Sequence, residues 1–138
     1  MILTGKLWKD GRYWLIECPA LDAMTQGFTK REALEMMVDW VQTALDDPGI
    51  KVQIKEAGKG GFQMKFDDPK PILGLMIDRA REAAGLTYEE VAKRVGLKSR
   101  SGIKTMASGK HDPQFSKIAN VLSAIGYDVQ VDLVPSKE

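Results

Sequence analysis

The chain has 138 residues, of which 43% are hydrophobic, 28% are charged and only one is cysteine, and its formal net charge at pH 7 is +1. This composition is typical of one ordinary domain or two small ones with packed cores, and it excludes a disordered chain and an internal disulfide. No apolar run approaches the roughly 20 residues that cross a bilayer, and the first residues lack the long apolar run of a signal peptide. We therefore expect a cytoplasmic protein that does not bind a membrane.

The first part of the chain alternates strand-like runs with turn residues. The runs "MILTGKLWK" and "RYWLIEC" flank Asp10-Gly11, a dipeptide that supplies the positive φ values of a tight hairpin. The stretch "PALDAMTQGF" predicts a loop that leads into a third strand. Two further strands are predicted in "IKVQIKEA" and "GFQMKFDD", on either side of a glycine-rich turn at residues 58–61. Cys18 is expected to be a small strand residue.

One helix is predicted between the third and fourth strands. Thr29 and Glu32 have the spacing of a capping box, so the helix should run from about Lys30 to Leu45. Its apolar residues form two stripes, which is a wider face than a sheet alone would bury. Trp40 and Met36 lie on the second stripe and are candidate contacts for a partner, although burial in the core is the commoner role for a tryptophan.

The best domain boundary lies at "DDPKP", residues 67–71, where two prolines and acidic residues interrupt both periodicities. Beyond it the pattern is helical. Four helices are predicted between residues 72 and 126, and the alternation of "YDVQVDLV" then predicts a half-exposed final strand. We expect an α+β domain at 1–67, a linker at 68–71 and a mostly α-helical domain at 72–138.

Positive charge is concentrated in the second domain. Residues 71–138 carry ten basic and eight acidic side chains, and six of the ten basic residues lie within residues 93–111, a stretch without any acid. Residues 1–70 carry ten basic and eleven acidic side chains. Such local patterning is compatible with a solvated surface or with a surface that binds a polyanion.

The stretch "GLTYEEVAKRVGLKSRSGIKTMASGKHDPQFSKIANVLSAIG" resembles the helix-turn-helix of the Cro and phage-repressor (Xre) type. The resemblance covers roughly residues 72–126. Opposite Ile103, the third helix of this domain carries the residues that are expected to read bases in a major groove, and the flanking positions suit phosphate contacts. The candidate base contacts are Arg100, Ser101, Lys104 and Thr105. The candidate phosphate contacts are Thr87, Tyr88, Lys98, Ser99, Lys110 and His111.

The stretch "YWLIECPALDAMTQGFTKREALEMMVDWVQTAL" resembles the HicB antitoxin domain in its strand, its proline-containing loop, its Thr-Gln-Gly and the Glu-Ala that opens a helix. The resemblance implies a partial ribonuclease-H-like fold without an active site. It also implies a partner, namely a small mRNA-cleaving toxin of the HicA type. Many members of that family append a DNA-binding module.

These features together predict the antitoxin of a type II toxin–antitoxin system, which masks its toxin and represses its own operon as a homodimer or higher oligomer on double-stranded DNA. Two alternatives remain open. In the first, the chain is a stand-alone regulator whose first domain binds a ligand or only dimerises. In the second, it is an adaptor that no longer binds DNA because one extra residue between Gly96 and Ile103 has disabled the third helix. We expect no enzymatic activity, no cofactor and no metal, since the first domain lacks converging carboxylates and the chain has a single histidine.

Overall fold

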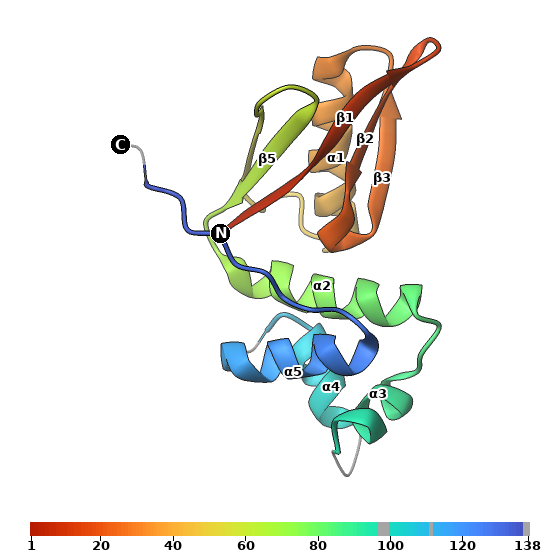
Figure 1. Ribbon diagram of the computed structural model, residues 1–138, viewed down its shortest axis with the longest axis vertical. Helices are drawn as coiled ribbons and strands as arrows, with labels where there is room; N and C mark the ends of the chain where they lie inside the picture. The colour runs from red at the N-terminus through yellow and green to blue at the C-terminus, as the bar shows by residue number, and fades with distance from the viewer. Residues whose placement is uncertain (97–99, 111, 137–138) are drawn as a thin grey trace.

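A five-stranded sheet with one helix stands over a group of four helices in the computed structural model of the chain, which describes residues 1–96, 100–110 and 112–136 (Figure 1). The strands are β1 (Ile2–Asp10), β2 (Tyr13–Cys18), β3 (Ala23–Gly27), β4 (Val52–Glu56) and β5 (Gly61–Phe66), with a short 3-10 turn, η1 (Pro19–Leu21), before β3. The helices are α1 (Lys30–Ala44), α2 (Pro69–Ala83), α3 (Tyr88–Val95), α4 (Ser101–Ala107) and α5 (Phe115–Ile125). The α+β class with a helical second part is therefore confirmed.

The sheet is entirely antiparallel and has the order β3-β2-β1-β5-β4. The predicted hairpin is present, since Asp10 pairs with Tyr13 and Gly11 has a φ of 62°. The last strand in sequence, β5, lies between β1 and β4, so the two ends of the domain's sequence meet in the middle of the sheet. The strands β3 and β4 are left as its edges.

Helix α1 covers one face of the sheet and begins where the sequence predicts. The Thr29 Oγ1 accepts a hydrogen bond of 3.0 Å from the Glu32 amide, while the Glu32 carboxylate reaches back to the amide of Phe28, at 3.3 Å. The helix approaches β3 closely at Gly27, where an added Cβ would lie 2.5 Å from the amide nitrogen of Ala33. Glycine is therefore required at Gly27 for α1 to pack on the edge of the sheet.

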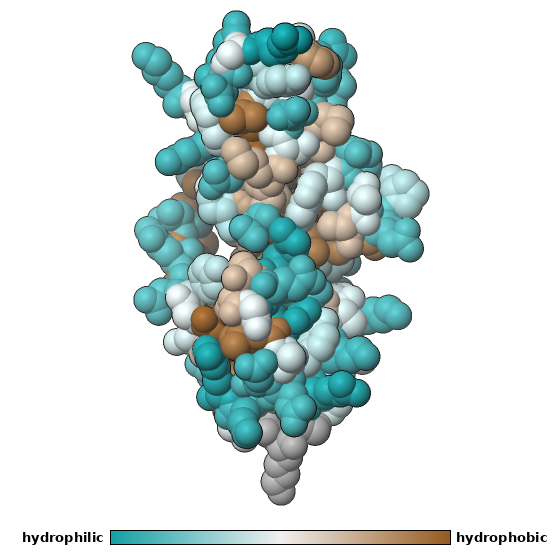
Figure 2. Space-filling model, turned by 90° about the vertical axis from the view of Figure 1, so that its right-hand side faces the viewer, coloured by the Kyte–Doolittle hydropathy of each residue, from teal (hydrophilic) through white to brown (hydrophobic). Residues whose placement is uncertain are grey.

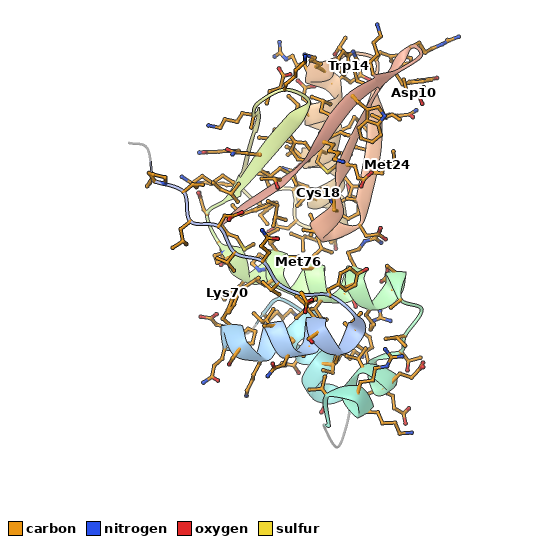
Figure 3. All side chains as sticks on the ribbon, viewed as in Figure 1. Asp10, Trp14, Cys18, Met24, Lys70 and Met76 are labelled. Carbon is orange, nitrogen blue, oxygen red and sulfur yellow. The ribbon has the colours of Figure 1, made fainter. Side chains whose placement is uncertain are left out.

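The molecule has two hydrophobic cores, and α2 contributes to both. Ile72 and Leu75 belong to the core between the sheet and α1, whereas Ile77 belongs to the core of the helical part. Cys18, at the end of the sheet nearest α2, is fully buried in the first core (Figure 3). The segment 68–71, predicted to be a linker, is instead the N-cap and the first turn of α2, because the side chain of Asp68 accepts a hydrogen bond from the Lys70 amide.

The predicted final strand is wrong for the single chain. Residues 127–136 form no strand, and every residue from Tyr127 to Ser136 is exposed. The physical reason is that a strand needs a hydrogen-bonded neighbour, and the segment leaves α5 without running along either edge of the sheet. On the face shown in Figure 2, apolar residues form small separate patches among hydrophilic ones. No helix within the described ranges is long and apolar enough to span a bilayer.

Candidate nucleic-acid interface

Helices α3 and α4 are held at the end of the molecule farthest from the sheet (Figure 1). Helix α3 begins with a complete capping box, in which the Thr87 Oγ1 and the Glu90 carboxylate each accept an amide hydrogen bond of 3.1 Å from the other residue. It ends at Gly96, whose φ is 86°. Val91 and Ile103 are fully buried in the second core, where α3 packs against α5 and α4 packs against α2 and α3. A short first helix with an αL glycine exit and a short second helix is the arrangement of a helix-turn-helix.

The predicted base-reading residues lie together on the exposed side of α4. Arg100 is the residue at its N-cap position, and Ser101, Lys104 and Thr105 lie on the helix; all four are exposed, while Ile103 is completely buried. Helix α4 itself contains no acidic residue. Among the described residues, neither Arg100 nor Lys104 forms an ion pair. The surface of α4 therefore offers positive charge and the exposed Thr105 side chain to the solvent.

An open hollow of about 310 Å³ is lined by residues from both predicted sets, the candidate base contacts and the candidate phosphate contacts. It is lined by Arg81, Thr87, Tyr88, Glu89 and Arg100, so the start of α3 and the start of α4 face the same space. The Arg81 guanidinium is ion-paired with Asp78 at 3.0 Å, whereas Arg100 forms no ion pair with any described residue. This arrangement places Arg100, predicted to contact a base, beside Thr87, predicted to contact a phosphate.

A polar network that the sequence analysis missed holds the start of α3 against α2. The Tyr88 hydroxyl donates to the Asp78 Oδ1 at 2.7 Å, and that oxygen also accepts from the Arg81 Nε and Nη2 at 3.2 and 3.0 Å. The Arg81 Nη1 donates to the Leu86 carbonyl oxygen at 2.7 Å, and its guanidinium lies 4.1 Å from the Tyr88 ring centroid. The sequence feature that could have indicated this network is the i, i+3 spacing of Asp78 and Arg81, which suits an ion pair on one face of a helix.

The environment of Tyr88 changes its predicted role. Burial, followed by the hydrogen bond to Asp78, raises the pKa of the Tyr88 phenol, so the hydroxyl keeps its proton at neutral pH. That proton is already donated to Asp78 and is not available to a phosphate. Tyr88 therefore positions α3, whereas the Thr87 hydroxyl lies at the exposed start of the helix.

The other predicted phosphate contacts lie on both sides of α4. Lys110 is exposed just after the helix, and its amide donates to the Ser108 Oγ at 3.4 Å. Lys98, Ser99 and His111 lie outside the described residues. Within the described part, the structure thus brings Lys110 to the exit of the helix whose entry is marked by Arg100.

The two residues predicted to contact a partner differ in accessibility. Met36 is 38% exposed on α1. Trp40 packs against the first core and lies under the guanidinium of Arg79, with 5.2 Å between the Arg79 Cζ and the ring centroid. Arg79 also donates to the backbone oxygens of Leu21 and Asp22, at 3.0 and 2.7 Å, so Trp40 belongs to the junction between the sheet and α2.

Comparison with known proteins agrees with this architecture in both halves of the chain. Residues 72–134 match the family model of a helix-turn-helix domain, a range that includes α3, α4, α5 and the segment after α5. The chain is also 28% identical over 130 residues to Antitoxin HicB 1 of Photorhabdus laumondii subsp. laumondii, in an alignment that covers 91% of this chain and 81% of the relative. The chain is thus similar to Antitoxin HicB over most of its length, and its residues 72–134 match a helix-turn-helix domain.

Proposed function

We propose that the chain is the antitoxin of a type II toxin–antitoxin pair and that it binds double-stranded DNA to repress its own operon. The observation that carries the DNA-binding half is α4, whose acid-free exposed side projects from a buried helix-turn-helix frame. Such a helix fits the major groove, where an arginine can donate two hydrogen bonds to a guanine. Arg100, Ser101, Lys104 and Thr105 would read bases, and Thr87 and Lys110 would bind phosphates.

The antitoxin half of the proposal is supported by the similarity to a HicB antitoxin along most of the chain. The domain formed by residues 1–67 would mask a small mRNA-cleaving toxin of the HicA type. The β3-β2-β1 meander followed by α1 also agrees with a partial ribonuclease-H-like fold. This domain would act by binding, without catalysis, in the cytoplasm.

Toxin masking is tested by co-expression with the product of the neighbouring reading frame, which this proposal expects to be a small basic protein, followed by pull-down of the tagged chain. We expect the small protein to be retained and its cleavage of mRNA to be suppressed. Arg100→Ala should retain it equally well, because α4 belongs to the other domain. The masking proposal would be overturned if the small protein neither bound the tagged chain nor cleaved mRNA.

DNA binding is tested separately by titrating the purified chain with the DNA upstream of its gene. We expect tight binding to that DNA and at least about 1,000-fold weaker binding to a scrambled duplex at the same salt concentration. Lys55→Ala, which removes an exposed lysine on β4 of the sheet, is the matched control and should not change the affinity. Equal binding to both duplexes would overturn sequence-specific repression.

A further inference from the structure

The segment after α5 has the sequence of a strand but makes no strand in the single chain. The apolar Tyr127, Val129, Val131 and Leu133 alternate with polar residues, and their exposed fractions are 48, 38, 59 and 94%. The Tyr127 amide bonds to the Leu122 carbonyl oxygen at the end of α5, and beyond it no hydrogen bond from Asp128 to Ser136 is made within the described part of the chain. The segment therefore exposes an apolar face and a row of unpaired backbone groups.

This segment is part of the helix-turn-helix domain. It follows directly from Gly126, which closes α5, and the domain match continues to residue 134, near the end of the alternating pattern. In Figure 1 it turns back from the end of α5 and leads past α2. The segment starts at the end of the domain that would bind DNA. A strand that pairs with it would therefore lie beside that domain.

We propose that this segment pairs antiparallel with the same segment of a second copy of the chain, about a two-fold axis at Val131. Antiparallel self-pairing keeps odd positions opposite odd positions, so the four apolar side chains would form one shared face. Val131 would face Val131 of the second copy, and Val129 would face Leu133. Each strand would then use residues 127–135, which is nearly the whole exposed segment.

Charge and the placement of Leu133 together select this register among the alternatives. An axis at Gln130 would place Asp128 opposite Asp132, and an axis at Asp132 would place that residue opposite itself; like charges directly opposite are destabilising. An axis at Val131 places Asp132 opposite Gln130 and Asp128 opposite Val134. An axis at Val129 also separates the acids, but it leaves Leu133, the most exposed of the apolar residues, opposite the end of α5.

The pairing rests on the proposed function in one respect. A two-fold dimer places two copies of α4 so that they read two half-sites of one operator, about one or more helical turns apart. The pairing itself does not require DNA, so it is tested on the full chain in solution without DNA. Its failure is then distinguishable from a failure of DNA binding.

Single-cysteine variants test the register. Directly opposite residues have Cβ atoms about 5 Å apart, whereas residues offset by four positions are about 13 Å apart, beyond the reach of a disulfide. We expect Val131→Cys to form a crosslinked dimer on mild oxidation, and Val129→Cys and Leu133→Cys to form little. The double variant Val129→Cys/Leu133→Cys should crosslink, because the cysteine at position 129 of one copy then faces the cysteine at position 133 of the other. Cys18 is fully buried, so the unmodified chain is the negative control.

Charge variants test the interface by molar mass from light scattering. Val131→Lys places two ammonium groups opposite each other at the axis and should give a monomer where the unmodified chain is a dimer. Gln130→Lys adds the same charge on the polar face, opposite Asp132, and should remain dimeric. Any one of three results would overturn the pairing: equal crosslinking at all three single positions, a dimeric Val131→Lys variant, or a monomeric unmodified chain. A monomeric unmodified chain would mean that this segment has to find its partner at an edge of the sheet.

Discussion

Gly74 of α2 and Gly109, just after α4, lie so close that a Cβ atom added at Gly74 would stand 2.7 Å from the amide nitrogen of Gly109. Gly109 has a φ of 70°, and a Cβ there would stand 2.8 Å from the Cα of Pro71. Both obstacles are backbone atoms, which cannot turn aside as a flexible side chain does. The two glycines therefore set the distance between α4 and α2, the helix that contributes to both cores.

Gly74→Ala should destabilise the protein by about 1–3 kcal/mol, because the new methyl group must push the end of α4 away from α2. Urea denaturation measures this loss. DNA binding should weaken as well, since α4 would change its position on the frame. Gly102→Ala is the matched control, an alanine for a glycine at an exposed position inside α4. It should stabilise the protein by about 0.5 kcal/mol. Equal stability of the two variants would contradict this account of the packing.

Arg100→Ala should weaken binding to the operator by about 1–3 kcal/mol and relax the preference for one base pair, if Arg100 reads a base edge. Binding to a set of operators with single base-pair changes measures both effects. The scrambled duplex serves as the control, because its binding should change much less. Unchanged affinity together with an unchanged preference would remove Arg100 from the reading surface.

Lys110→Ala should have a different signature. An ammonium group on a phosphate contributes equally on every sequence, so the affinity for operator and scrambled DNA should fall by a similar factor. The slope of log affinity against log salt concentration should become shallower by about one unit. A selective loss on the operator would instead indicate that Lys110 contacts a base.

Tyr88→Phe should cost about 1 kcal/mol of stability, because it removes the 2.7 Å hydrogen bond to Asp78 while keeping the ring under Arg81. Thermal or urea unfolding measures the change. The affinity for the operator should fall only slightly, through a small displacement of α3, since the hydroxyl is not expected to contact phosphate. A large loss of affinity without any loss of stability would restore Tyr88 as a direct contact.

The pH dependence of stability should report on Cys18. Burial raises the pKa of its thiol from 9.0 to about 11 in the folded chain. The folded state therefore holds the proton more tightly than the unfolded state, so this contribution to stability is complete below pH 9 and is lost as the pH rises through about 11. Urea midpoints between pH 8 and 11 should fall more for the unmodified chain than for Cys18→Ala. Parallel curves would show that the thiol does not titrate this way.

Local features of the chain were predictable because they depend on neighbours in sequence. The hairpin at Asp10-Gly11 and the start of α1 after Thr29 follow from backbone preferences and short hydrogen bonds, and both are confirmed. The exposed side of α4 followed in the same way, from the helical spacing of Ile103 and its neighbours. The bonds of Arg79 to Leu21 and Asp22 join residues more than fifty positions apart, and no periodicity announces them.

The sequence by itself determined the five strands of the sheet, most of the helices, the α+β and helical parts, and the surface that carries positive charge, since these depend on periodicity, caps and composition. Only the tertiary structure decided that β5 lies beside β1, that α2 serves two cores, and that Asp78 and Arg81 hold Tyr88. It also decided that residues 127–134 have no strand partner within the described chain. Each of these outcomes depends on which distant surfaces pack together, and a strand pattern indicates the need for a neighbour without identifying it.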